Sequence, residues 1–172
     1  LRPGETARPG VLITLQKEVV SSPFAVAGTI DRWLADSDKR LSSAERSSLS
    51  KIQSIVADID VTTKQQRLSN IVETIQDQLE TARLVVFTQF RPTQDAIADR
   101  VEELDLPAHI VNGDLSSKAK ERKVADFERE GGVMVATDSI SEGRNMQFCN
   151  VLVNYDLPWN PMKVEQRIGR VD

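Results

Sequence analysis

The chain has 172 residues, of which 40% are hydrophobic and 28% are charged, and its formal net charge at pH 7 is −4. This length supports one domain with a hydrophobic core and some additional helices. Acidic and basic residues are nearly balanced along the chain, which argues against a general polyanion-binding surface.

The cysteine and histidine content limits the kinds of covalent bond and metal site that the chain can form. The single cysteine, Cys149, excludes an internal disulfide and indicates a reducing compartment. The single histidine, His109, argues against a zinc site, and we expect no metal ligands from this chain. No apolar run approaches the roughly 20 residues of a membrane span, and no signal segment opens the chain. We therefore expect a cytoplasmic protein without a membrane partner.

The first 80 residues predict a helical lead-in segment. Residues 11–34 favour a helix that is broken or bent at Ser21, Ser22 and Pro23. Two further stretches repeat apolar residues at i, i+3, i+4 and i+7, the first beginning at Ile52 and the second at Leu68. About three amphipathic helices are thus expected before any sheet begins.

The pattern changes in residues 81–172, which we expect to form a second domain. Short apolar runs rich in β-branched residues predict strands at 84–87, 108–111, 133–136 and 151–154, and helical patterns fall at 92–104 and 117–130. Strands that alternate with helices favour an α/β fold, with a parallel sheet covered by helices on both faces. Ligands of such sheets bind at the carboxyl ends of the strands, which places Thr88, Gly113, Asp138 and Asp156 along one rim.

The run from Gln166 to Asp172 carries the most specific chemistry of the chain. Arg167 and Arg170 stand three residues apart, and we expect Gln166 and both arginines at the start of a short helix. A planar guanidinium forks onto phosphate oxygens. The sequence nevertheless contains no GxxxxGK[ST] loop and no Asp followed by Glu. These arginines therefore suggest one half of a phosphate site whose other half lies elsewhere.

Four sequence blocks in a fixed order carry a family resemblance. They are residues 85–90, the block from Gly113 to Phe127, residues 135–145, and residues 166–170, with a Trp-Asn-Pro turn before the last. Together they make residues 84–172 similar to the second RecA-like lobe of superfamily-two helicases. More narrowly, they resemble the Swi/Snf-type DNA translocases, and within those the RapA-like branch. Because the chain begins at Leu1 and ends within the last block, we expect a part of a longer protein.

The resemblance implies roles for the last block. Arg170 matches an arginine finger that reaches ATP bound to the first lobe, and a second finger is expected three residues later, beyond Asp172. Arg167 matches a residue that either contacts phosphate or supports this block, and Gln166 helps to organise the nucleotide cleft. The structural alternative is a pair of surface arginines that form ion pairs with Glu165 or Asp172.

The other blocks imply contacts on either side of the same rim. The loop after residue 136 resembles motif V, whose end, at Gly143, Arg144 and Asn145, would face the nucleotide. The resemblance assigns contacts with the nucleic-acid backbone to a set of residues that follow the strands: Thr88, Gln89, Gly113, Ser116, Thr137 and Asp138. The structural alternatives are a polar loop around Gly143 and simple helix capping by Ser116.

Taken together, the resemblance implies the carboxyl-terminal lobe of an ATP-dependent translocase on double-stranded DNA. ATP and its Mg²⁺ would be held mainly by the first RecA-like lobe of the same protein, and this chain alone would be inactive. RapA-like relatives include a polymerase-recycling factor, and related enzymes occur in phage defence, so RNA polymerase or defence-system proteins are candidate partners.

Two rival interpretations remain open at this point. One is a RecA-like module that binds nucleic acid or protein without ATP, and the other is an unrelated α/β enzyme with its own nucleotide site. Trp159 also has two interpretations, of which a hydrophobic brace for the approach to Gln166 is favoured over an exposed partner contact.

Overall fold

The computed structural model describes residues 9–36, 41–79, 82–140, 146–169 and 171. The chain divides into two compact units, Leu1–Thr62 and Thr63–Asp172, and each is described by itself.

The first unit is helical in its described part. It contains α1 (Pro9–Ser21), α2 (Pro23–Ala35) and α3 (Ser43–Ala57). The predicted break is confirmed: Ser22 is extended, its hydroxyl accepts a hydrogen bond from the Ala25 amide, and Pro23 opens α2. A proline fits the first turn of a new helix, whereas inside a continuous helix it would remove a hydrogen bond.

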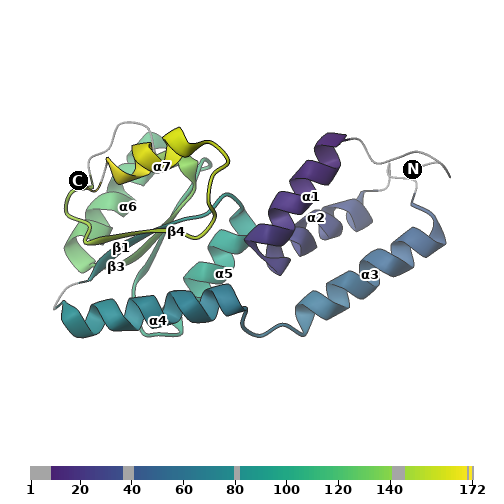
Figure 1. The fold of residues 1–172 in the computed structure, drawn as a ribbon, viewed down its shortest axis with the longest axis horizontal. Coiled ribbons are helices and arrows are strands. Elements are labelled where there is room, and N and C mark those ends of the chain that lie inside the picture. Colours follow the sequence, from purple (N-terminus) through teal and green to yellow (C-terminus); the bar gives the residue numbers. More distant parts are fainter. Residues whose placement is uncertain (1–8, 37–40, 80–81, 141–145, 170, 172) are drawn as a thin grey trace. The chain divides into compact units, whose positions relative to one another are not determined.

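The second unit is α/β, as the sequence predicts, and is drawn in teal to yellow in Figure 1. A long helix, α4 (Thr63–Gln78), precedes the sheet. The remaining elements, in chain order, are β1 (Arg83–Phe87), α5 (Arg91–Glu102), β2 (Ala108–Val111), α6 (Ser117–Glu130), β3 (Gly132–Ala136), the short 3₁₀ helix η1 (Asp138–Ile140), β4 (Val151–Asn154) and α7 (Pro161–Ile168).

The four strands form one parallel sheet in the order β2-β3-β1-β4. The register pairs Phe87 at the end of β1 with Ala136 of β3 and with Asn154 of β4. The carboxyl ends of these strands therefore lie side by side, and the segments that follow them form a common edge.

Alternate residues of the strands face two separate hydrophobic cores. On one face, Leu84 and Val86 pack with α4 and α5, which contribute residues such as Leu68 and Ile97. On the other, Val85 and Phe87 pack with Phe127 of α6. Figure 1 shows α4 and α5 on one side of the sheet and α6 and α7 on the other. Because both faces are covered, the strands are almost entirely apolar, as expected of a buried parallel sheet.

Candidate functional site at the carboxyl edge of the sheet

Backbone hydrogen bonds extend the sheet by one residue beyond its strands. The amide of Thr88 donates to the Ala136 carbonyl at 3.0 Å, and the amide of Thr137 donates to the Val111 carbonyl at 3.1 Å. The amide of Tyr155 donates to the Phe87 carbonyl at 2.9 Å. The residues that directly follow β1, β3 and β4 are thus held in register with the neighbouring strands.

The carboxylate of Asp156 joins the ends of β1 and β4. Its Oδ2 accepts a hydrogen bond from the Thr88 hydroxyl at 2.6 Å and another from the Gln89 amide at 3.0 Å. Thr88 is fully buried and Asp156 is 7% exposed. The predicted nucleic-acid residue Thr88 therefore directs its hydroxyl inward, while Gln89 is half-buried at the edge.

A lysine from α4 completes this junction. Lys64 Nζ lies 3.1 Å from Oδ1 of Asp156, and 4.1 Å from the centre of the Tyr155 ring. The pairing connects residues 92 positions apart in the chain. The sequence does not indicate Lys64, because no local pattern distinguishes it from the other lysines on solvated helix faces.

Arg167 forms a second junction at the same edge. Its side chain is 1% exposed, and its Nη2 donates to Oδ1 of Asp138 at 2.5 Å. Nη1 donates to the Asn154 side chain at 2.5 Å, and the guanidinium lies 4.6 Å above the Phe87 ring. Among the described residues, no acceptor is found for Nε. The guanidinium is thus held against the sheet rather than displayed at the surface.

Asp138 is neutralised by two cations. Lys163 donates to its Oδ2 at 2.7 Å, opposite the Arg167 contact on Oδ1. Partial burial raises the pKa of Asp138, but the hydrogen bonds and charges of Lys163 and Arg167 outweigh that effect, and the net pKa lies below its ordinary value. Asp156 is likewise paired with Lys64. Because both carboxylates are paired, this edge is compatible with a negatively charged ligand such as a nucleotide or DNA phosphate.

The helix that carries Arg167 starts earlier than the sequence suggested. The expectation that Gln166 and the arginines open a helix is wrong: α7 begins at Pro161, and Gln166 and Arg167 lie near its end. Asn160 explains the difference, because its side chain accepts from the Met162 amide at 3.1 Å, and Pro161 occupies the first turn.

The other residues that the resemblance assigns to the nucleotide are Gln166, Arg170 and the end of the loop after β3. Gln166 is exposed on α7. Arg170 and the segment 141–145, with Gly143, Arg144 and Asn145, lie outside the described residues. Sequence and structure together therefore bring Thr88, Gln89, Thr137, Asp138 and Arg167 to one edge, and Gln166 to the same helix as Arg167.

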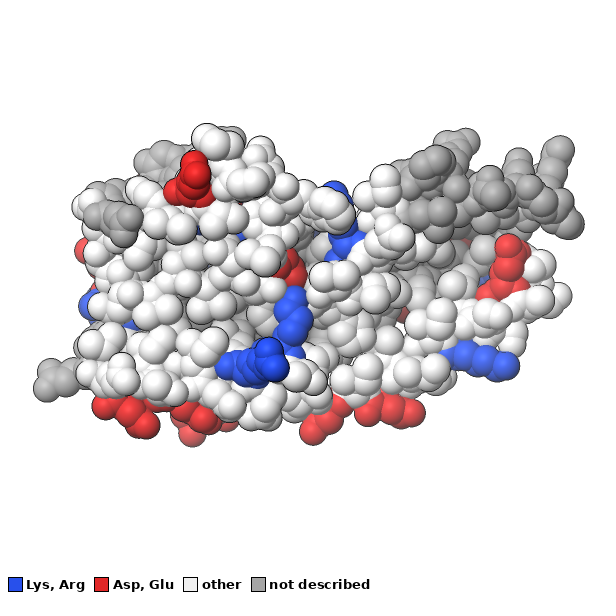
Figure 2. All heavy atoms as spheres, in the orientation of Figure 1, with Lys and Arg blue, Asp and Glu red and all other residues white. Residues whose placement is uncertain are grey.

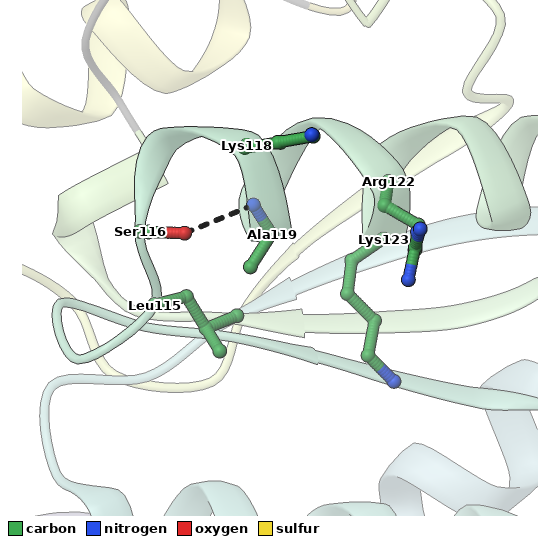
Figure 3. A pocket seen from close by; sticks show the side chains of 6 residues that line it. All are labelled: Leu115, Ser116, Lys118, Ala119, Arg122 and Lys123. Carbon is green, nitrogen blue, oxygen red and sulfur yellow. Dashed lines mark hydrogen bonds between the residues drawn. The ribbon is translucent and has the colours of Figure 1, made fainter.

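Gly113 and Ser116 lie beyond the end of β2. Gly113 is exposed in a turn, and the Ser116 hydroxyl caps α6 by accepting from the Ala119 amide at 3.3 Å. Ser116 also lines an open pocket of about 320 Å³ with Leu115, Lys118, Ala119, Arg122 and Lys123. Figure 3 shows the cap bond and the three basic side chains that project from α6. Helix capping and a positively charged surface thus coincide here.

A buried glutamine supports this edge and was not identified from the sequence. Gln94 of α5 is fully buried, and its Nε2 donates to the carbonyls of Val111 and Val135 at 3.0 and 2.8 Å. Its Oε1 accepts from the Asn112 side chain at 3.1 Å. Arg91, at the start of the same helix, pairs with Asp114 in the turn after β2. Only its position in an otherwise apolar helix face could have indicated Gln94.

Trp159 differs from its favoured interpretation. The side chain is 81% exposed, so it does not pack as the hydrophobic brace that the sequence suggested. The turn is instead fixed from within by Asn160, whose side chain caps α7. Neighbouring apolar residues are also exposed: Leu157 by 74% and Met162 by 55%.

His109 and Cys149 are both buried in the second unit. His109 is buried, lies 3.1 Å from the Gly131 carbonyl through its Nε2, and contacts the Phe127 ring. Burial raises the pKa of Cys149 to about 12, which makes its thiol unreactive at neutral pH. Among the described residues, no group of three or more acidic, histidine or cysteine side chains could hold a metal ion. In the same residues, no helix has the length and hydrophobicity of a membrane span.

Comparison with known proteins identifies the family. The helicase conserved C-terminal domain matches residues 63–172, which is most of the chain and coincides with the second compact unit. The chain is 30% identical over 160 residues to the uncharacterized ATP-dependent helicase YqhH of Bacillus subtilis, with 93% of this chain and 28% of that protein aligned. It is 34% identical over 109 residues to the RNA polymerase-associated protein RapA of Vibrio atlanticus, covering 62% of this chain and 11% of RapA.

Solved structures show the same fold at low sequence identity. The helicase domain of Pyrococcus furiosus Hef superposes with a TM-score of 0.63 at 20% identity, covering 84% of this chain and 33% of that one. The C-terminal part of the Fun30 ATPase domain gives 0.59 at 12% identity, covering 88% of this chain and 57% of that one. The chain therefore belongs to the helicase conserved C-terminal domain family, as a second RecA-like lobe of superfamily-two helicases with relatives of the RapA, Swi/Snf-like type.

Proposed function

We propose that this chain is the carboxyl-terminal lobe of an ATP-dependent translocase on double-stranded DNA. In this proposal the lobe supplies an arginine finger to a composite ATPase site and one grip on the DNA backbone. The observation that carries it is the pairing of Arg167 with Asp138, which joins α7 to the segment that follows β3. This pairing supports a positioning role for Arg167 beside the proposed finger.

Arg167 and Arg170, the two arginines of the last sequence block, receive different roles in this proposal. Arg167 is buried against Phe87, Asn154 and Asp138, which supports a positioning role. We assign the finger to Arg170, which the family pattern aligns with the phosphate-contacting arginine. Such a finger contributes about 10³–10⁵ in rate in well-studied phosphoryl-transfer systems.

The nucleotide would be shared between two lobes. Gln166 and the segment with Gly143, Arg144 and Asn145 are our candidates on this side of the cleft. The neutralised state of Asp138 supports this assignment, because an unpaired carboxylate would repel a phosphate. ATP supplies the free energy for movement, and the first lobe would supply the phosphate loop and the Mg²⁺ ligands.

For the DNA grip we propose backbone contacts along the edge that carries Gln89, Thr137, Gly113 and Ser116. Lys118, Arg122 and Lys123 line the Ser116 pocket and give it three positive charges. Phosphate contacts of this type position a protein on DNA without reading its sequence. We therefore expect little sequence preference.

The surface charge supports weak DNA binding by this chain alone. On the face shown in Figure 2, basic and acidic side chains of the described residues alternate with wide uncharged areas, and no continuous basic band is visible. The net charge of −4 agrees with this. Each neutralised phosphate adds about 0.9 to the slope of log affinity against log salt, so few contacts predict a shallow salt dependence.

The direct test uses the protein that carries both lobes. We expect its ATP hydrolysis to be stimulated by double-stranded DNA, and we expect it to displace a triplex-forming strand from a duplex without separating the duplex itself. The 172-residue chain alone should give no turnover above a buffer blank, because its sequence contains no phosphate loop.

Three results would contradict the proposal in different ways. Turnover by the isolated chain that survives repurification would contradict the composite site. DNA or protein binding without any ATPase in the two-lobed protein would favour an ATP-independent module. Separation of the two strands of the duplex would show that the protein unwinds DNA and does not only move along it. Because RapA relatives are RNA polymerase-associated by name, co-purification with RNA polymerase is our first partner test.

A further inference from the structure

The carboxylate of Asp156 connects three segments that are far apart in the chain. Oδ2 holds the Thr88 hydroxyl and the Gln89 amide, both of which directly follow β1. Oδ1 holds Lys64 from the first turn of α4. Asp156 itself follows β4 by two residues. A single side chain therefore fixes the loop after β1 to the end of β4 and to α4.

Burial makes this junction stiff. Thr88 is fully buried and Asp156 nearly so, and a buried charge that loses one partner is strongly destabilised. The Thr88 hydroxyl and the Gln89 amide both donate to Oδ2, so the loop after β1 has little freedom to turn. The side chain of Gln89 is held next to the same segment, because its Nε2 donates to the Leu157 carbonyl at 3.5 Å.

The junction also includes the first turn of the second compact unit. Lys64 is the second residue of α4, and the division between the units falls between Thr62 and Thr63. A displacement of the first turn of α4 would therefore act on Asp156, and through it on Gln89. Lys64 is 39% exposed, so it can be replaced without opening a cavity.

We propose that Asp156 is a positioning residue for the DNA grip, and that Lys64 couples the start of α4 to it. This inference rests on the proposed function. Thr88 then acts inside the protein, by orienting the loop, and the phosphate contact is made by the exposed part of the loop at Gln89. We assign neither Asp156 nor Lys64 to the nucleotide.

The first test compares two substitutions of Thr88 in the two-lobed protein. Thr88→Val keeps the shape but removes the hydroxyl, whereas Thr88→Ser keeps the hydroxyl. ATP hydrolysis is measured against the concentration of duplex DNA. We expect Thr88→Val to raise the DNA concentration for half-maximal stimulation about tenfold, and Thr88→Ser to stay within about twofold of wild type. The DNA-free rate and the KM for ATP should change less than about twofold in both.

The second test distinguishes coupling through Lys64 from a general effect of removing a positive charge from α4. Lys64→Met should raise the half-maximal DNA concentration in the same way as Asp156→Asn, and the double variant should be no worse than the stronger single one. Arg67→Met is the matched control, because Arg67 is an exposed cation on the same helix. It should behave as wild type. Thermal unfolding of every variant identifies any that fails to fold. If Asp156→Asn fails to fold, the comparison of Lys64→Met with Arg67→Met still tests the proposal.

The outcomes distinguish this inference from the proposed function. If duplex DNA does not stimulate the wild type, the translocase proposal is contradicted and the positioning role falls with it. If the wild type is stimulated but Thr88→Val matches Thr88→Ser, only the positioning role is overturned. Equal effects of Lys64→Met and Arg67→Met would overturn the coupling through Lys64.

Discussion

The guanidinium of Arg167 lies 2.5 Å from the carboxylate of Asp138, which fastens the last turn of α7 to the segment that follows β3. Lys163, one turn earlier on α7, binds the other oxygen of the same carboxylate. The resemblance left Arg167 with either a phosphate contact or a supporting role and assigned Asp138 to the nucleic acid; the structure shows the two residues as partners of each other. This relationship gives Arg167 partners within the protein, which is why we propose Arg170, and not Arg167, as the arginine that contacts a phosphate.

Replacing Arg167 should destabilise the fold. Arg167→Met removes one partner of a buried ion pair, a change that typically costs about 3–5 kcal/mol, and the lower end applies because Asp138 is 31% exposed and keeps Lys163. Urea unfolding measures this loss. Gln166→Ala, at the exposed neighbour, is the control and should stay within about 0.5 kcal/mol of wild type. An equally small loss for Arg167→Met would contradict its positioning role.

The pH dependence of Asp138 follows from its partners. Its folded pKa lies below the ordinary value of 3.8, so its contribution to stability is complete above that value and is lost as the pH falls through the lower, folded pKa. A carboxyl-carbon NMR titration should place the midpoint of Asp138 below 3.8. Arg167→Met should move the midpoint upward. A wild-type midpoint at or above the ordinary value would show that the cations do not outweigh burial.

Gly132 should tolerate no side chain. Its φ is +87°, and a Cβ atom there would lie 2.3 Å from the Pro107 carbonyl oxygen, which is backbone and not free to move. Gly132→Ala should therefore cost about 2 kcal/mol or more in the free energy of unfolding. Gly169→Ala is the matched control, since the nearest atom to its Cβ would be at an ordinary 3.5 Å. Similar losses for both variants in denaturant titrations would rule out the steric explanation.

The fold was predictable because its signals are local. Short runs of β-branched residues located β2 and β4 with the bounds that the structure gives, and the alternation with helices predicted the parallel sheet. Ser22 and Pro23 likewise predicted the break between α1 and α2.

The site was less predictable, because its decisive contacts are distant in sequence. Lys64 and Asp156 are 92 positions apart, and Arg167 and Asp138 are 29 apart. Nothing in the local pattern of Arg167 indicates that it points inward. The start of α7 was missed for a different reason: Asn160 and Pro161 form a helix-opening pair, but they stand in a turn that also contains Pro158.

The assignment of the finger to Arg170 is tested most directly by the rate of DNA-stimulated ATP hydrolysis in the two-lobed protein carrying Arg170→Ala. The proposal predicts a loss of about a thousandfold or more in kcat, a modest change in ATP affinity and little change in DNA binding. Arg170→Lys should not restore the rate, because an ammonium cannot reproduce the planar fork. A turnover of Arg170→Ala within about threefold of wild type, far from the thousandfold loss of a missing finger, would contradict the account.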